Sequence, residues 1–464
     1  MNSIQLRKSN ASPLLISIAW TLCSFAIALS LKDQYTLFVH NILVFCTFIS
    51  YVLCFSTWRS AGGKITSVYF FFVAYALLSN LGASIVYSTL SWTNSTEFLK
   101  IYEYSSWNSI VNMLRFQLMC VASLNLGTAI CITGRPISSP PEIQITSTGR
   151  YNNLEKIWFI CLIYNLYLGF HYLFLRSTMT YTELDREILT ENWGIFGVLC
   201  TYGFLFLSML ELVKGRRVKT IYFFLILLSF LFMVSGKRYM AIRFIGALAV
   251  FMPLTHAKYF KKKYAWVWIV ISLSFLAFIN ILRMTRGDSL GTASIENKGF
   301  MGLILGTFAE MGQSEWPAII IMDYLNGTNQ HLYTLFSAFS RTFGLDILFG
   351  FETTQSMGVF VTKLMDTNYG LGGSYIAEAF ANFGWYGWIF VLIYGWLITY
   401  LENYAYGNIN SPRKRWVSIA ILALLLRQVF YARAQFDLCA FDLRMLFVIW
   451  VFSLFNIHKN KKYG

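Results

Sequence analysis

Long apolar runs dominate the pattern of hydrophobic and polar positions along this chain. A helix needs roughly 20 apolar residues to cross a bilayer, so each run predicts one membrane-spanning helix. The alternating pattern of a membrane β-barrel is absent. Only Lys237 and Arg238 separate the seventh run from the eighth, which predicts a helical hairpin. The twelve runs lie near residues 13–31, 35–56, 66–88, 108–132, 157–176, 193–213, 220–236, 239–257, 265–282, 374–400, 416–432 and 441–457.

The composition leads to the same class of protein. Of 464 residues, 56% are hydrophobic and 13% are charged, about half the charged share of a soluble domain. A soluble fold of this size cannot hide so much apolar surface, because its own surface must be largely polar. A soluble enzyme, a disordered chain and a disulfide scaffold are therefore excluded. The sequence predicts an all-α polytopic membrane protein with about 12 transmembrane helices.

The basic residues predict how the chain is oriented. With the N-terminus in the cytoplasm, the inside segments carry 21 Lys and Arg against four Asp and Glu, and the outside segments 13 against 18. Cytoplasmic loops are rich in Lys and Arg, so we expect both termini in the cytoplasm. The net charge of +15 is thus a signal of topology, and no nucleic acid partner is expected. The first run is interpreted as a retained span rather than a cleaved signal peptide.

This topology divides the chain into three parts. Residues 1–282 hold spans one to nine, residues 283–373 form one large outer loop, and residues 374–464 hold spans ten to twelve. A loop of that length is expected to be partly folded and functional. Within it, residues 299–323 are apolar with interspersed acids, which predicts an amphipathic helix that lies on the membrane surface or dips into it. We expect the loop to pack against the bilayer, where a lipid-linked substrate presents its head.

Neither a metal site nor a cofactor site is expected. Seven of the eight Cys lie in predicted spans and are interpreted as small packing residues. The five His are scattered, and no Cys/His metal spacing or phosphate-binding glycine loop occurs.

Arginines on the predicted outer face are candidates for binding a diphosphate. The planar guanidinium matches phosphate oxygens and stays charged, although some of these arginines could instead pair with acids such as Asp288. Arg427 lies deep in span eleven, where an isolated cation is costly. A structural partner and a substrate role are equally open for it. The candidates are Arg238, Arg283, Arg286, Arg433 and Arg427.

A polar stripe begins span ten. Ser374, Glu378 and Asn382 follow one another at intervals of four residues, so they share one helix face. Ser374 can cap the helix, and the helix dipole alone could explain Glu378. The stripe as a whole favours the lining of a cavity.

Four short segments resemble one known family. The pattern Gly-Gly-Ser-x-x-Ala-Glu-x-x-x-Asn-Phe-Gly-x-x-Gly at 372–387 is similar to a segment of Wzy-type O-antigen polymerases near their last large outer loop. Phe308-Ala-Glu-Met-Gly312 resembles a Glu-x-Gly element in that loop. Ser235-Gly-Lys-Arg238 and Ala432-Arg433 resemble the family's outer arginine positions. The resemblance covers the whole chain in topology, and its motifs cover about forty residues.

The resemblance implies a fold, a reaction and partners. The chain would be a GT-C-like, metal-independent glycosyltransferase of the bacterial inner membrane, with its active site on the periplasmic face. It would join a growing glycan on undecaprenyl diphosphate to a second lipid-linked oligosaccharide repeat unit and release undecaprenyl diphosphate. Glu378 and Glu310 are the candidate bases, followed by Asp288 and His331. Membrane lipid, a chain-length regulator and a flippase are the further partners implied.

Other functions stay open at this point. An O-antigen ligase has a similar architecture but transfers glycan to lipid A-core. A flippase for lipid-linked sugars is less favoured, because transporters often contain internal repeats and none is evident here. A structural scaffold subunit does not explain the arginines.

Overall fold

A computed structural model gives the structure of the chain. It describes residues 2–32, 34–91, 105–134, 137, 152–178, 194–213, 217–236, 238–255, 299–325, 332–350, 357–365, 373–411 and 414–433. Throughout these ranges the secondary structure is helical, with no strand. The chain divides into two compact units, each built from separate stretches of sequence. The first unit comprises Met1–Ser138, Phe275–Asn403 and Gln428–Phe441, and the second comprises Ser139–Ser274, Tyr404–Arg427 and Asp442–Gly464.

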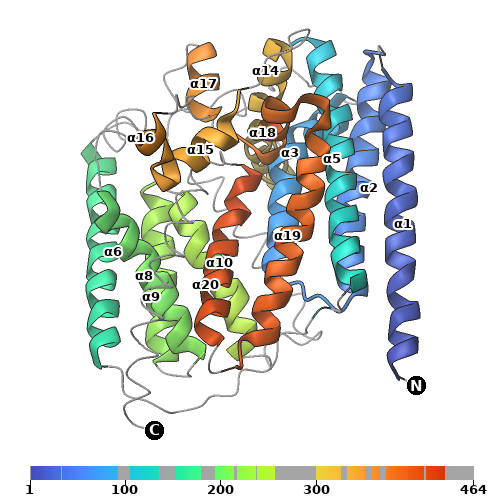
Figure 1. Ribbon diagram of the computed structural model, residues 1–464. Helices are drawn as coiled ribbons and strands as arrows, with labels where there is room; N and C mark the ends of the chain where they lie inside the picture. Colours follow the sequence, from blue (N-terminus) through green and yellow to red (C-terminus); the bar gives the residue numbers. More distant parts are fainter. Residues whose placement is uncertain are drawn as a thin grey trace. The chain divides into compact units, whose positions relative to one another are not determined.

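Long, roughly parallel helices form the body of the first unit (Figure 1). They are α1 (Asn2–Ser30), α2 (Leu37–Ser60), α3 (Val68–Ser91), α5 (Trp107–Gly134) and the part of α19 (Gly387–Asn408) that ends at Asn403. Helix α5 is central, since most of its apolar stretch is buried. Glycines let α19 approach it closely: a Cβ on Gly127 would lie 2.0 Å from Leu392 O, and one on Gly395 would lie 2.5 Å from Leu124 O. Small residues at such contacts are how membrane helices pack tightly.

A buried carboxylate fixes the start of α3. The first N–H groups of a helix have no partner within the helix itself. Here Glu402, from α19, accepts hydrogen bonds from Val68 N (2.7 Å) and Tyr69 N (2.8 Å). Each carboxylate oxygen thus serves one donor, and α3 is joined to α19 at this end.

Short helices crowd the other end of the first unit, at the top of Figure 1. They are α13 (Gly299–Met311), η3 (Gly312–Ser314), α14 (Glu315–Leu325), α15 (Thr334–Phe343), α16 (Leu345–Phe349), α17 (Met357–Leu364) and α18 (Tyr375–Phe383). The large loop is therefore partly helical, as predicted.

Residues 299–323, expected on the membrane surface or dipping into it, pack largely against other helices of the protein. This segment forms α13, η3 and α14, which pack against α3 and α5. Several of its apolar residues are buried in the protein, among them Ala309 and the run Ile319–Met322. Protein-facing and membrane-facing helices look alike in hydropathy, so the pattern alone could not separate them.

Span ten is a broken helix. The positive φ of Gly384 (55°) ends α18, and the one-turn helix η4 (Gly384–Tyr386) leads into α19. Gly387 allows the tight turn, because a Cβ there would lie 2.4 Å from Ala379 O. The polar stripe of Ser374, Glu378 and Asn382 thus lies on a short helix of its own.

The second unit is a separate helical bundle. Its helices are α6 (Asn152–Thr178), α8 (Gly194–Val213), α9 (Val218–Val234), α10 (Arg238–Thr255) and the part of α20 (Arg415–Gln428) that ends at Arg427. The tight turn at Ser235 and Gly236 (φ 91°) joins α9 to α10, so the predicted hairpin is confirmed. Aromatic side chains fill the core, for instance Phe232 stacked on Phe244.

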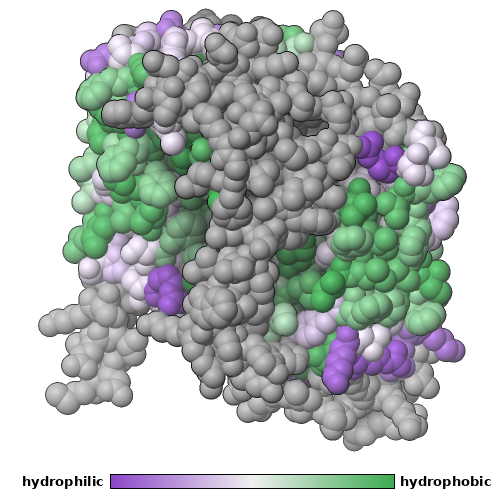
Figure 2. Space-filling view, turned by 180° about the vertical axis from the view of Figure 1, so that it is seen from behind, coloured by the Kyte–Doolittle hydropathy of each residue, from purple (hydrophilic) through white to green (hydrophobic). Residues whose placement is uncertain are grey.

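Six helices of the described part are long and apolar enough to cross a membrane: Ser12–Ser30, Leu37–Ser60, Val68–Thr89, Trp107–Thr133, Glu155–Thr178 and Tyr375–Asn408. Helices α8, α9, α10 and α20 coincide with four further predicted spans and have 20, 17, 18 and 14 residues. The predicted spans at 265–282 and 441–457 lie outside the described residues. In Figure 2, hydrophobic residues form the middle of each visible block of described surface, and hydrophilic residues lie toward its ends. The described part of the chain is all-helical, and the protein is a polytopic membrane protein.

Candidate functional site

Helix α18 provides the first element of the candidate site. Ser374 caps it as predicted, since the Ser374 side chain accepts a hydrogen bond from Ala377 N (3.1 Å). The helix has no exposed polar face, because every residue from Tyr375 to Asn382 is buried. The polar stripe therefore faces other parts of the protein.

Glu378 is bound to a distant part of the chain. The Tyr431 hydroxyl donates a hydrogen bond to Glu378 Oε2 (2.9 Å), and both side chains are almost fully buried. Tyr431 belongs to the one-turn helix η5 (Val429–Ala432) that follows α20, and the half-buried Arg433 comes directly after it. The structure thus brings the segment at 372–387 next to the turn that precedes Arg433. In the sequence these two segments stood apart, and nothing indicated that they meet.

A hydrogen bond from α3 also holds the one-turn helix η5 in place. Asn80 Nδ2 donates to Ala432 O (2.7 Å), and Gln117 Nε2 of α5 donates to Asn80 O. The hydroxyl groups of Tyr51 and Tyr375 lie 3.4 Å apart nearby. Four helices (α2, α3, α5 and α18) therefore contribute polar groups around η5. We call this set (Glu378, Tyr431, Asn80, Gln117, Tyr51 and Tyr375) the polar cluster.

Glu315 joins the large loop to α3 at Ala83 and Ser84, shortly after Asn80. Its Oε1 accepts hydrogen bonds from Ala83 N (2.9 Å) and Ser84 N (3.2 Å), and the Ser84 hydroxyl donates to Oε2. Burial raises the pKa of Glu315 to about 8, against the opposing effect of these three bonds. Glu315 is 1% exposed and was not among the predicted site residues.

The glycine of the Glu-x-Gly element has a packing role beside Glu315. A Cβ on Gly312 would lie 1.9 Å from Ala83 N, and one on Gly82 would lie 2.5 Å from Phe308 O. The backbones of η3 and α3 are therefore in direct contact. Only glycine permits this, so the loop has one fixed position on α3.

Asn382 ties α18 to α15. Its Oδ1 accepts a hydrogen bond from Leu335 N (3.1 Å), and its Nδ2 donates to Thr334 Oγ1 (2.8 Å) and to Glu378 O (2.8 Å). Leu332 N donates to Ala381 O (2.9 Å) in addition. Asn382 thus satisfies the free N–H of the first turn of α15, the task normally performed by a capping residue.

The remaining predicted residues are not placed in the polar cluster. Glu310 lies in α13, two residues before Gly312, and its side chain lies outside the described residues. Arg283 and Arg286 also lie outside them. Arg238 begins α10 and Arg427 is buried near the end of α20, both in the second unit.

Residues that sequence reasoning missed are the partners of the predicted ones. Tyr431, Asn80 and Gln117 bind or surround the Glu378 segment. A usable signal existed for the two amides, because an uncharged polar side chain inside an apolar span needs a hydrogen-bond partner. For Tyr431, one tyrosine among 28, no signal in the sequence stands out.

The arrangement offers two chemical resources. A buried carboxylate hydrogen-bonded to a phenol can accept a proton, and Arg433, two residues after Tyr431 in the sequence, carries a positive charge. Among the described residues, no group of three or more His, Cys, Asp or Glu side chains could hold a metal ion.

The fold and the site define an integral membrane protein whose polar cluster lies among its spanning helices, beside a large helical loop. The family to which it belongs follows from comparison. The family model for the O-antigen polysaccharide polymerase Wzy matches residues 14–462, nearly the whole chain, and the protein is a member of that family. It is therefore a glycosyltransferase-type enzyme of O-antigen polymerisation in lipopolysaccharide biosynthesis, acting on lipid-linked oligosaccharide repeat units. No curated protein and no solved structure gives a significant match.

Proposed function

We propose that the chain lengthens O-antigen at the periplasmic face of the inner membrane, with both termini in the cytoplasm and a GT-C-like fold of about twelve spans. The growing glycan leaves its undecaprenyl diphosphate and is joined to the incoming lipid-linked repeat unit. The observation that carries the proposal is the hydrogen bond between Tyr431 and Glu378, which joins one segment that resembles the family to the residue just before another. Arg433 comes two residues after Tyr431, which supports a carboxylate and a cation acting together.

The arginines stabilise the leaving group in this proposal. As the bond between the donor sugar and the diphosphate breaks, negative charge grows on the diphosphate, and fixed cations lower the energy of that state without a metal ion. Arg433 is the best supported, since it closely follows the residue that binds Glu378. Arg238, Arg283, Arg286 and Arg427 are the further candidates.

Glu378 is the proposed base, with Glu310 as the second candidate. A hydroxyl of the acceptor sugar attacks the anomeric carbon of the donor, the bond to the diphosphate breaks, and the hydroxyl proton passes to the carboxylate. In this structure Glu378 Oε2 accepts a hydrogen bond from the Tyr431 hydroxyl. The acceptor hydroxyl takes that place during the reaction.

Two variants distinguish a catalytic role of Glu378 from a purely structural one. Glu378→Gln keeps an oxygen that can accept the Tyr431 hydroxyl but cannot take up a proton. Tyr431→Phe removes the hydrogen bond but keeps the carboxylate. If Glu378 is the base, the Gln variant loses polymerisation and the Phe variant retains most of it. A Gln variant that keeps polymerisation would show that Glu378 is not the base, and loss of activity in the Phe variant alone would show that the pair only holds the turn.

The test is made in the native host after deletion of the gene. Each variant is returned at wild-type protein level, and surface lipopolysaccharide is run on a gel. Deletion should reduce a long ladder to core plus one repeat unit, and Arg433→Ala should fail to restore the ladder. Loss of every repeat unit would point to a ligase or a flippase instead. Lipid-linked polymer on the outer side of the membrane would identify the ligase.

A chain-length regulator and a flippase complete the proposed partners. The first would act on the same growing polymer, and the second would deliver each repeat unit to the outer side. Co-purification of the intact protein from the native membrane, with and without the regulator gene, tests the first partner.

A further inference from the structure

Helix α15 and the short α16 after it turn an aromatic face away from the protein. Phe336, Phe339 and Phe343 are each about half exposed, and they share one helix face by their spacing. In α16, Leu348 and Phe349 are exposed even further, at 72% and 67%. Five large apolar side chains of these two helices are thus exposed.

The inward face of α15 has the opposite character. Its buried residues are small and mostly hydroxylated: Thr334, Ser337, Ala338, Ser340 and Thr342. The one charged residue, Arg341, lies on the side away from the three phenylalanines, and its Nε donates to Ser337 O (3.3 Å). A helix in water would bury the phenylalanines and expose the hydroxyl groups. The arrangement found here is the reverse and suits an apolar surrounding.

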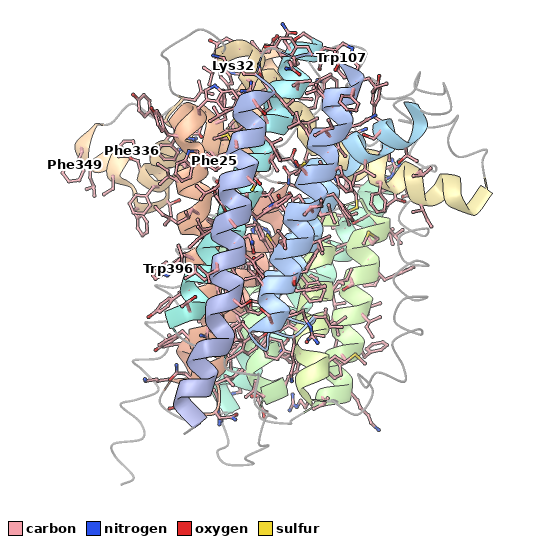
Figure 3. The ribbon with its side chains drawn as sticks, turned by 90° about the vertical axis from the view of Figure 1, so that its right-hand side faces the viewer. Phe25, Lys32, Trp107, Phe336, Phe349 and Trp396 are labelled. Atoms are coloured by element: carbon pink, nitrogen blue, oxygen red, sulfur yellow. The ribbon has the colours of Figure 1, made fainter. Side chains whose placement is uncertain are left out.

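The level of this aromatic face along the long helices also agrees with an apolar surrounding. Figure 3 shows Phe336 and Phe349 at about the level of Phe25, and clearly below Lys32 and Trp107, which mark the ends of the long helices. Phe25 belongs to the candidate span Ser12–Ser30. The aromatic face therefore stands at a depth where neighbouring long helices meet the bilayer.

The aromatic face also continues a surface that a membrane covers. Helix α19 belongs to a candidate span, and its exposed side includes Ile389, Ile393 and Trp396. Trp396 lies on the same side as Phe336 and Phe349, further along the long helices (Figure 3). The hydrogen bonds from Asn382 and Ala381 hold α15 to α18, directly before α19.

We propose that α15 and α16 are a membrane-seated element, whose aromatic face contacts the acyl chains of one bilayer leaflet. This contact with the acyl chains fixes α18, and with it Glu378, at the edge of the hydrocarbon layer of the membrane. A substrate anchored in the same leaflet can then reach the polar cluster from the side. The seat itself does not depend on the chemistry proposed for Glu378.

The test uses the full chain in its native membrane. Benzoylphenylalanine, a photoreactive relative of phenylalanine, replaces Phe336, Phe339 or Phe343 one at a time. The matched control is the same replacement at Tyr324, an exposed aromatic residue near the end of α14, which lies at the top of Figure 1. After irradiation, mass spectrometry of the purified protein identifies what has been attached.

Phospholipid adducts at the three phenylalanine positions, several-fold above those at Tyr324, are the expected result. Crosslinks to a second protein copy would overturn the proposal, because the face would then be an interface between proteins. No adduct at these positions, or equal lipid adducts at Tyr324, would overturn it as well. None of these readouts requires polymerase activity, so the result is independent of the proposed function.

Discussion

Replacing Glu315 by glutamine and by alanine should have very different effects on stability. Because burial raises the pKa of Glu315 to about 8, the side chain is largely neutral at pH 7. A glutamine side chain at this position has the same shape and no charge. The glutamine Oε1 can keep the bonds from Ala83 N and Ser84 N, and the glutamine Nε2 can donate to the Ser84 hydroxyl oxygen in place of the bond that the hydroxyl donates now.

The alanine variant loses all of these interactions. Two buried backbone N–H groups then lose their carboxylate acceptor, at a cost of about 1–3 kcal/mol for each donor left unsatisfied. The loop also loses one of its attachments to α3. We therefore expect Glu315→Ala to lower the free energy of unfolding by at least about 2 kcal/mol, and Glu315→Gln to change it by less than about 1 kcal/mol.

The stability of the wild type and that of the glutamine variant should also depend differently on pH. The folded-state pKa of Glu315, about 8, exceeds the ordinary value of 4.5, so between these values the folded protein holds a proton that the unfolded chain has released. The stabilisation from this group is complete below pH 4.5 and falls as the pH rises toward 8. The slope is about 1.4 kcal/mol per pH unit at most. Glutamine does not titrate, so its variant lacks this contribution.

Thermal unfolding of the detergent-solubilised protein measures both effects. Wild type and the two variants are compared from pH 5 to pH 8.5, with the slope against pH as the main result. A glutamine variant that follows the wild-type pH dependence would refute the assignment of that dependence to Glu315. An alanine variant as stable as wild type would refute the anchoring role of its hydrogen bonds.

Three further predictions concern packing and capping. Gly312→Ala should lower the free energy of unfolding by about 1–3 kcal/mol, because the added Cβ would lie 1.9 Å from the Ala83 backbone. The control is Gly169→Ala, whose Cβ would lie 3.2 Å from the Leu231 side chain. It should be nearly neutral in thermal unfolding. Asn382→Ala should speed amide hydrogen exchange at the start of α15 without changing α5, and unchanged exchange would contradict its capping role. Ser374→Ala should lower thermal stability by about 1 kcal/mol, whereas Ser374→Asp, which can also cap, should not.

The spans and the cap of α18 could be predicted because their causes are local. Bilayer thickness sets the length of an apolar run, and a capping serine binds an N–H three residues away. The hairpin between α9 and α10 is local in the same sense, since two residues separate its apolar runs.

The connections of the site could not be predicted, because they join distant parts of the chain. Asn382 finds its partners 47 and 48 residues earlier, and Tyr431 lies 53 residues after Glu378. Ser374, Glu378 and Asn382 are all buried at or in α18, but nothing in their spacing specifies what they meet. For residues 299–323 the apolar pattern was real, and only the surrounding was misassigned, since buried protein and bilayer are equally apolar.

The backbone contact between Gly312 and α3 limits how parts of this protein can be exchanged with those of its relatives. A large loop between two spans resembles an independent module that could be transplanted to change the sugar specificity. Here η3 meets α3 without an intervening side chain, and Glu315 then binds two backbone N–H groups of the same helix. A hybrid protein that takes its loop from one family member and α3 from another would have to reproduce this contact atom by atom. The loop and α3 should therefore be inherited, and engineered, together.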